Sequence, residues 1–323
     1  MKLQHMLAPL ALLLGGCGGG ADQPVQVTIP RGSSLSAAAD SLAAHDAIGS
    51  PTAFRYYARL RSRGRAIQPG IYDIPAGASW SEILQKLVSG DVARARFTIP
   101  EGWTSNQIAE RIGPVARVPV DSVLRIVADT AAARRFGVPG PTLEGYLYPA
   151  TYELPVGSAV DEVVRVLTRR YKQVWTPALR ARADSVGMNE REVVTLASII
   201  ETEAKVWDER PVVSAVYNNR LRIGMRLQAD PTVQYALGSR QSRLLYSHIR
   251  DVADNPYNTY TNSGLPPGPI ASPSAGSIRA ALYPADVPFL YFVARPDGTH
   301  VFTRTLAEHN AAKRQSQRAR NAR

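Results

Sequence analysis

Apolar residues recur at helical spacing near the middle of the chain, and they predict its clearest amphipathic helix. The apolar stripe consists of Val193, Leu196, Ala197, Ile200 and Ala204. These positions lie on one face of a helix of about 3.6 residues per turn. Asn189 precedes the stripe at the place of an N-cap residue, and Glu190 and Glu192 follow in the first turn, where carboxylates suit the helix dipole.

Two glutamates near the end of this helix are candidates for proton transfer. At about 100° per residue, Glu201 and Glu203 project from opposite edges of the apolar stripe, and neither lies on the fully solvated face. A carboxyl group half-buried in apolar surroundings has a raised pKa, which suits a proton donor near neutral pH. Periodicity alone favours the alternative that both are surface glutamates at a helix edge.

The same pattern predicts a second amphipathic helix directly downstream. Asp208 is its expected N-cap, Pro211 lies in its first turn, and the helix is expected to end near Gly224. Asn219 is among the polar residues that it presents. Its apolar positions are Val212, Val213, Ala215, Val216 and Leu221.

Two later segments, residues 225–233 and 255–261, combine side-chain amides, carboxylates and hydroxyls with aromatic rings. Their notable side chains are Gln228, Asp230, Tyr257, Asn258 and Tyr260. This mixture suits a sugar, whose ring faces stack on aromatic rings while its hydroxyls need directional hydrogen-bond partners. Core packing with a hydrated hydroxyl is an equally good explanation for each tyrosine taken alone.

A short turn sequence occurs three times in the first third of the chain. Residues 29–34, 74–79 and 99–104 each end a β-type run, turn on Pro-x-Gly and offer a Ser or Thr N-cap to a helix. Strand–turn–helix units of this size are typical of small LysM-type glycan-binding modules. We therefore expect a small α+β domain over residues 25–113, although Ile-Pro-x-Gly is also simply a good strand-to-helix turn.

The remaining elements follow from periodicity and turn signals. We expect helices at residues 51–63, 120–136 and 158–187, a strand and turn at 65–74, a β-hairpin at 289–302 and a basic frayed helix or tail at 313–323. Residues 143–152 place Glu144 beside a glycine and among three tyrosines that include Tyr148. This segment is either a functional contact or an aromatic loop that packs across a domain junction.

Composition indicates the class of partner. The chain has 323 residues, a net charge of +11 and a pI of about 9.9. This charge favours an anionic partner such as phospholipid headgroups or a cell-wall glycan. The basic residues are dispersed and no nucleic-acid-binding module is recognisable, so we expect no nucleic-acid partner.

The N-terminus indicates the compartment. A short apolar run at residues 6–14 resembles the hydrophobic region of a secretory signal, and Leu14-Gly15-Gly16-Cys17 resembles a lipobox with a lipidated cysteine, followed by a glycine-rich linker at 18–24. The alternative is a degenerate signal peptide with a chance cysteine. Cys17 is the only cysteine, which excludes an intrachain disulfide and a metal–thiolate cluster.

Several blocks together resemble one family, the YceG-like or MltG-type endolytic murein transglycosylases. The resemblance covers about residues 25–310 in conserved block order. The matching blocks are residues 143–149, 197–201, 219–228, 230–233, 257–260 and 264–268. Two features depart from the family: Glu201-Thr202-Glu203-Ala204 replaces the common Glu-Lys-Glu-Thr, and the short run before Cys17 replaces a membrane-spanning helix.

The resemblance implies an α+β protein with a LysM-like subdomain at 25–113 and a mainly helical catalytic domain at 114–312 that ends in a β-hairpin. It implies a bacterial envelope enzyme that cuts nascent peptidoglycan internally and leaves 1,6-anhydro ends, without cofactor or metal. Glu201 falls on the catalytic position. The implied substrate-binding residues are Glu144, Tyr148, Asn219, Gln228, Asp230, Tyr257, Asn258 and Tyr260. The implied partners are peptidoglycan strands, cell-wall synthases and a membrane, to which the N-terminal anchor would attach the protein on the periplasmic side.

Two alternatives stay open. A hydrolytic muramidase would add a second carboxylate, for which Asp230 or Glu144 would serve. A non-catalytic wall-binding lipoprotein would need only the turn-repeat domain, and would leave the Glu201 helix unexplained. The five histidines lack ligand spacing and no Gly-x-Ser-x-Gly occurs, so metallohydrolase and serine hydrolase chemistry find no support.

Overall fold

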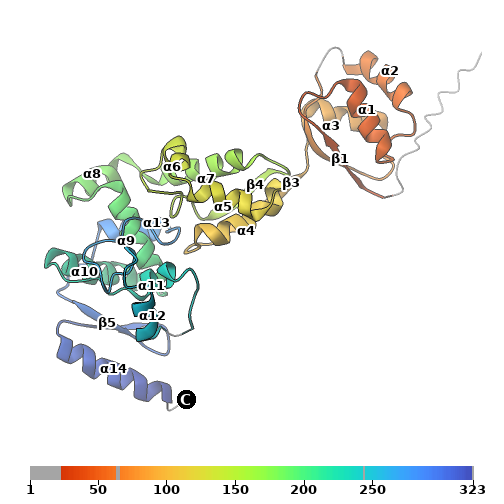
Figure 1. Cartoon of the computed structure of the whole chain (residues 1–323). Helices are drawn as coiled ribbons and strands as arrows, with labels where there is room; N and C mark the ends of the chain where they lie inside the picture. Colours follow the sequence, from red (N-terminus) through yellow and green to blue (C-terminus); the bar gives the residue numbers. More distant parts are fainter. Residues whose placement is uncertain (1–22, 63–65, 243, 322–323) are drawn as a thin grey trace, which may run out of the picture. The chain divides into compact units, whose positions relative to one another are not determined.

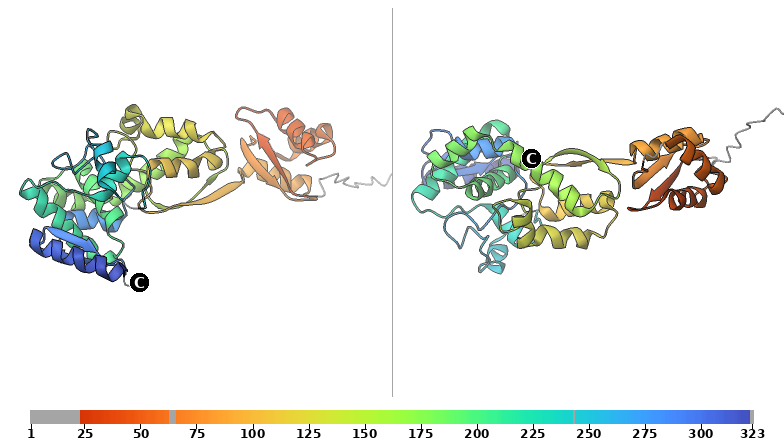
Figure 2. Two further views of the ribbon diagram at one scale, coloured as in Figure 1. Left: turned by 60° about the horizontal axis from the view of Figure 1, so that its bottom comes forward. Right: turned by 90° about the horizontal axis from the view of Figure 1, so that it is seen from above.

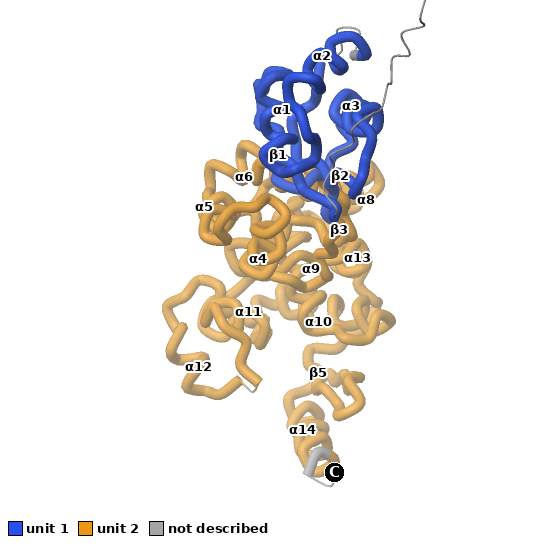
Figure 3. The backbone as a smooth tube through the Cα atoms, turned by 90° about the vertical axis from the view of Figure 1, so that its right-hand side faces the viewer, with its two compact units in different colours: residues 1–95, 155–157 blue, residues 96–154, 158–323 orange. Residues whose placement is uncertain are grey.

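The computed structural model describes residues 23–62, 66–242 and 244–321. The chain forms two compact units, coloured separately in Figure 3. Unit 1 takes its described residues from Met1–Ala95 and Pro155–Gly157, and unit 2 from Arg96–Leu154 and Ser158–Arg323. The division therefore differs from the predicted boundary at residue 113, because the helix after the third turn copy packs against helices of unit 2.

Unit 1 is a two-stranded antiparallel sheet packed against helices. The strands pair with Val27 opposite Tyr72, and both side chains are fully buried in a core that also contains Phe54 and Leu87. Its elements are β1 (Val25–Ile29), α1 (Leu35–Ala44), α2 (Pro51–Ser62), β2 (Gly70–Ile74) and α3 (Trp80–Ser89). The predicted helix at 51–63 is confirmed.

The three copies of the predicted turn all form. In each, the glycine adopts the left-handed conformation that other residues rarely adopt, and the Ser or Thr side chain accepts a hydrogen bond from a backbone N–H in the first turn of the helix. The glycines are Gly32, Gly77 and Gly102, and the caps are Ser34, Ser79 and Thr104. The repeat is thus a local strand-to-helix device that serves both units.

Unit 2 is mainly helical, and Figures 1 and 2 show its elements from three directions. Strands β3 and β4 pair with each other at the start of this unit. The predicted C-terminal β-hairpin, formed by β5 and β6, is confirmed and packs against α14. The described elements of the α+β fold are β3 (Arg94–Ile99), α4 (Ser105–Ala116), α5 (Val120–Ala128), α6 (Thr130–Phe136), β4 (Ala150–Pro155), α7 (Val160–Val174), α8 (Pro177–Ser185), α9 (Glu190–Glu203), η1 (Trp207–Glu209), α10 (Arg210–Arg222), α11 (Asp230–Ala236), α12 (Tyr246–Asp251), α13 (Ala275–Leu282), β5 (Tyr291–Ala294), β6 (His300–Thr303) and α14 (Leu306–Asn321).

Helix α9 lies at the centre of unit 2 and packs against α8, α10, α11 and α13 (Figure 1). Asn189 caps it as predicted and forms a reciprocal capping box with Glu192. Every residue from 193 to 200 is buried, so the helix is enclosed on all sides rather than along one stripe. Buried Ser198 donates to the Thr195 carbonyl and accepts from the Ile270 N–H, so its polar group remains satisfied.

The predicted long helix at 158–187 is wrong, because the structure divides it into α7 and α8. Pro177 begins α8, and Thr176 before it is extended with ψ 160° and caps the new helix. The predicted helical connector at 120–136 is confirmed, and it consists of two helices, α5 and α6, separated where Asp129 caps α6.

Two other expectations need correction. Asp208 does not cap α10: it lies within the 3₁₀ turn η1, and Pro211 takes the expected place in the first turn of α10. The basic segment at 313–323 is not a separate tail, since α14 continues through it to Asn321.

Within the described ranges, the structure contains no helix that is both long and apolar enough to cross a membrane.

Candidate functional site

The two glutamates at the end of α9 lie in different surroundings. Glu203 is the last residue of the helix, and Ala204 then adopts an extended conformation that turns the chain away. Being two positions apart, Glu201 and Glu203 project to different sides of α9. Their partners therefore come from different elements, which gives the two carboxyl groups different chemistry.

Glu201 is held by an ion pair and two hydrogen bonds. Its side chain is 4% exposed, and Arg210 Nη2 lies 2.7 Å from Oε1. Ser274 donates its backbone N–H over 2.8 Å and its hydroxyl over 2.6 Å to Oε2. Both carboxylate oxygens thus have close donors, and the group joins α9 to the starts of α10 and α13. These contacts describe a structural brace between the three helices.

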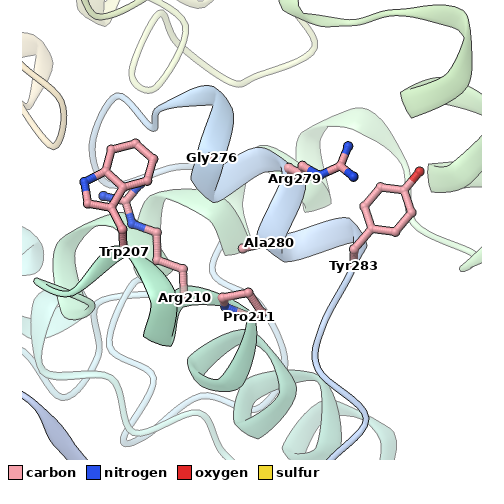
Figure 4. A pocket seen from close by; sticks show the side chains of 7 residues that line it. All are labelled: Trp207, Arg210, Pro211, Gly276, Arg279, Ala280 and Tyr283. Carbon is pink, nitrogen blue, oxygen red and sulfur yellow. The ribbon is translucent and has the colours of Figure 1, made fainter.

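Arg210 extends this brace to a small surface pocket (Figure 4). Its guanidinium carbon lies 3.8 Å from the centroid of the Trp207 ring, and a β-carbon at Gly276 would lie 2.4 Å from that ring. The pocket has a volume of about 130 Å³, and Tyr283 lies at its other end. This is room for about four water molecules at roughly 30 Å³ each.

Glu203 is a carboxyl group poised to exchange a proton. The Tyr217 hydroxyl donates a hydrogen bond to Oε1 over 3.1 Å, and the backbone N–H of Asp230 also donates to the carboxyl. Burial, reinforced by the negative charge of Asp230, raises the pKa of Glu203 to about 7, although Tyr217 and Arg220 oppose the shift. At neutral pH this group is present in both protonation states, as a general acid and base requires.

Asp230 and Tyr260 complete the surroundings of Glu203. The Tyr260 hydroxyl donates to Asp230 Oδ1 over 2.5 Å, and burial together with this carboxylate raises the pKa of Tyr260. Gln228 takes a left-handed conformation with φ 48°, and its N–H donates to the Thr259 carbonyl over 3.1 Å. This cross-link holds the two polar and aromatic segments side by side.

Comparison with known proteins identifies the family of this chain. The sequence profile of the YceG-like family matches residues 27–315. The chain belongs to the YceG-like family. That match covers both compact units and the whole of the Glu201–Glu203 region.

Relatives of this YceG-like chain include two bacterial proteins named endolytic murein transglycosylase. The protein from Bacillus subtilis is 36% identical over 308 residues, which cover 90% of this chain and 84% of that protein. The protein from Streptococcus pneumoniae is 28% identical, and the match spans 84% of this chain but only 54% of the relative's length. A yceG-like protein from Listeria monocytogenes with a crystal structure is 33% identical in sequence to this chain. The two structures superpose with a TM-score of 0.62, and the match covers 99% of that protein's chain.

Two of the predicted substrate-binding residues donate hydrogen bonds to backbone carbonyls. Asn258 is fully buried and donates to the carbonyls of Ile249 and Val252. Asn219 donates to the carbonyls of Val287 and Phe289 and so fastens α10 to the segment before the hairpin. Both amides donate to backbone carbonyls in the structure, and their predicted role in substrate binding stays a prediction.

Glu144 is a buried brace rather than an exposed contact. It is 3% exposed and accepts hydrogen bonds from the Ser105 N–H and, over 2.8 Å, from the Ser105 hydroxyl at the start of α4. Tyr235 donates a further hydrogen bond, and the Tyr257 ring lies 4.8 Å from the Tyr235 ring. Burial raises the pKa of Glu144 to about 7 despite these donors.

Tyr148 belongs to the Glu201 side. It is half-buried and accepts a hydrogen bond from the backbone N–H of Ala275. Burial raises the pKa of Tyr148, and the negative charges of Glu101 and Glu201 add to the rise. Of the predicted residues, the structure thus gathers Asp230 and Tyr260 beside Glu203, and places Tyr148 apart from them. Cys17 lies outside the described residues.

Sequence reasoning missed the residues that distinguish the two glutamates. The sequence analysis singles out neither Tyr217, which lies within the predicted second amphipathic helix, nor Ser274, although a serine before the Ala-Gly-Ser-Ile run carries an N-cap signal. Among the described residues, no group of three or more His, Cys, Asp and Glu side chains is arranged to hold a metal ion.

Proposed function

We propose that this chain is a peptidoglycan lytic transglycosylase that cuts nascent glycan strands internally at MurNAc–GlcNAc bonds. Membership of the YceG-like family and the names of its relatives support this class of reaction. The observation that carries the mechanism is the carboxyl group of Glu203, whose pKa burial raises to about 7 between Tyr217 and Asp230.

Glu203 takes the role of acid and base in this proposal, in place of Glu201. Protonated Glu203 donates its proton to the glycosidic oxygen as the bond to the anomeric carbon breaks. The resulting carboxylate accepts the proton of the C6 hydroxyl as O6 bonds to the same carbon, which closes the 1,6-anhydro ring. One carboxyl group serves both steps, so the reaction consumes no water.

Glu201 suits this role less well because three donors already occupy its two oxygens. Arg210 donates to Oε1 and Ser274 donates twice to Oε2, which leaves one of about four acceptor positions for a substrate. Asp230 acts on Glu203 by holding a negative charge nearby, which favours the protonated acid and also stabilises positive charge that develops on the sugar ring.

A hydrolytic muramidase remains the second candidate, because Asp230 is an exposed carboxylate beside Glu203 and would be the group that activates water. Glu144 is less suitable, since it is buried against Ser105. Digestion of purified peptidoglycan in H₂¹⁸O, followed by mass spectrometry of the released muropeptides, separates the candidates. The proposal predicts anhydro ends without ¹⁸O, whereas reducing ends that carry ¹⁸O would support hydrolysis and contradict it.

We further propose that unit 1 is a LysM-like glycan-binding subdomain. Its order β1–α1–α2–β2, with the two strands antiparallel, supports this assignment. A variant that lacks residues 25–95 should sediment less with insoluble wall, and equal sedimentation would contradict the assignment. The net charge of +11 and the lipobox-like Cys17 support a place in the bacterial envelope, anchored to a membrane and near the synthases that make the strands.

A further inference from the structure

Unit 2 contains a second, larger pocket beside α4. Its volume is about 360 Å³, against about 130 Å³ for the pocket beside Arg210. Sites for small organic ligands are typically about 300–1,000 Å³, so only the larger pocket has room for a sugar ring. Its lining residues are Phe97, Trp103, Gln107, Glu110, Arg111, Pro114 and Val115.

The pocket has an apolar base and a polar rim. Phe97 and Val115 are buried beneath it, and the Trp103 ring is half-buried. The guanidinium carbon of Arg111 lies 5.3 Å from the centroid of that ring. Glu110 is exposed at the rim. Flat aromatic and aliphatic surface next to hydrogen-bonding groups is the arrangement that a pyranose ring requires, since its faces are apolar and its edges carry hydroxyls.

The polar groups of the rim are available for a ligand. Within the described part of the chain, neither Glu110 nor Arg111 forms an ion pair or a hydrogen bond with another side chain. Glu110 offers acceptors and Arg111 offers donors, and the side-chain N–H₂ of Gln107 adds two more donors. Opposite charges at the rim disfavour a purely anionic ligand and suit a neutral, hydroxyl-rich one.

The pocket is fixed to the same structural frame as the end of α9. The Gly102 N–H donates to the Ser272 carbonyl over 2.9 Å, and the Ser272 N–H donates to the Trp103 carbonyl over 2.8 Å. Ser274, two residues further on, holds Glu201. A β-carbon at Gly102 would lie only 3.8 Å from Glu201 Cγ. Gly102, the neighbour of Trp103 in the chain, therefore lies close to α9, the helix that carries Glu203.

We propose that this pocket, the Trp103 subsite, binds one pyranose ring of the glycan strand away from the bond that is cut. The inference rests on the proposed function, because a strand cut internally continues on both sides of the reacting bond. Trp103 stacks on the sugar face, while Glu110, Arg111 and Gln107 bind its hydroxyl and N-acetyl groups. Strand binding at this site fixes where the enzyme cuts along a strand without taking part in the chemistry.

The test measures the binding of the full chain, as its Glu203→Gln variant, to immobilised peptide-free glycan strands by interferometry. Trp103→Ala should weaken binding by about 5- to 30-fold, as expected for loss of a central aromatic contact. Glu110→Ala should weaken it by about 2- to 10-fold. Trp103→Phe should keep most of the affinity, and Tyr283→Ala, an aromatic residue of the smaller pocket, should leave it unchanged.

Affinity within twofold of the parent for both Trp103→Ala and Glu110→Ala would overturn the proposal. So would a loss confined to strands that carry stem peptides, because the ligand would then be a peptide. If melting shows Trp103→Ala to be unfolded, Glu110→Ala decides the matter. If the Glu203→Gln variant still cuts the immobilised strands, mass is lost from the surface. That loss would refute the role of Glu203, whereas the relative affinities of the variants test the Trp103 subsite.

Discussion

Arg210 Nη2 lies 2.7 Å from Glu201 Oε1, and this ion pair gives Glu201 a role that Glu203, two residues later, does not share. Glu201 is held in place by a cation and a serine. Glu203 instead has a tyrosine and a carboxylate as neighbours, and its pKa lies at about 7. The opposing effects of these two neighbours can be tested one at a time.

Asp230→Asn should lower the pKa of Glu203, because it removes the negative charge that favours the protonated acid. A general acid must be protonated, so the alkaline limb of the kcat/KM profile should move to lower pH and activity at pH 8 should fall most. The measurement is release of anhydromuropeptides between pH 5 and 9. An unshifted alkaline limb would show that Asp230 does not set this pKa.

Tyr217→Phe should move the same limb in the opposite direction. Its hydroxyl donates to Glu203 Oε1 and stabilises the ionised carboxylate, so its removal should raise the pKa of Glu203. Phenylalanine keeps the edge-on ring contact with Phe292, which makes this a conservative change. A shift to lower pH would contradict the assigned hydrogen bond.

The two glutamine variants should differ in stability. Glu201→Gln leaves buried Arg210 without its close counter-charge and should cost about 3–5 kcal/mol of unfolding free energy. Glu203→Gln should instead gain stability relative to the parent as pH rises from about 4.5 to 7. In that window the unfolded carboxyl has lost its proton while the folded one retains it, so ionisation opposes folding. Urea unfolding at pH 5 and pH 8 measures both effects, and a Glu201→Gln variant as stable as the parent would contradict the brace.

Cys17→Ser should release the protein from membranes if Leu14-Gly15-Gly16-Cys17 is a lipidation signal. Stable anchoring needs more than one acyl chain, so loss of the lipidated cysteine should shift nearly all of the protein to the soluble fraction. Fractionation and intact-mass analysis measure this. A mature wild-type chain that still begins at Met1 would refute the signal.

Local rules predicted much of the fold. The Pro-x-Gly turns, the Asn189 cap and the hairpin depend on neighbours within a few residues, and all formed as expected. The apolar pattern alone does not predict the division of residues 158–187 at Pro177, which follows from the restriction that proline imposes on the residue before it.

The choice between the glutamates was beyond sequence reasoning. Periodicity placed both at the edges of α9, and the family resemblance favoured Glu201. What separates them is which distant residue lies beside each: Ser274 is 73 positions from Glu201, and Asp230 reaches Glu203 from the start of α11. Tertiary contacts of this kind determine a pKa, and local spacing does not encode them.

The most direct test of the account compares Glu203→Gln with Glu201→Gln in the full chain, with the yield of anhydromuropeptides from purified peptidoglycan as the readout and thermal melts as the control for folding. General acid–base groups contribute about 10²- to 10⁴-fold in rate. The account predicts that Glu203→Gln remains folded and loses activity by at least that order, while Glu201→Gln melts at a lower temperature but still cuts below its melting temperature. A folded Glu201→Gln variant without activity, beside an active Glu203→Gln variant, would contradict it.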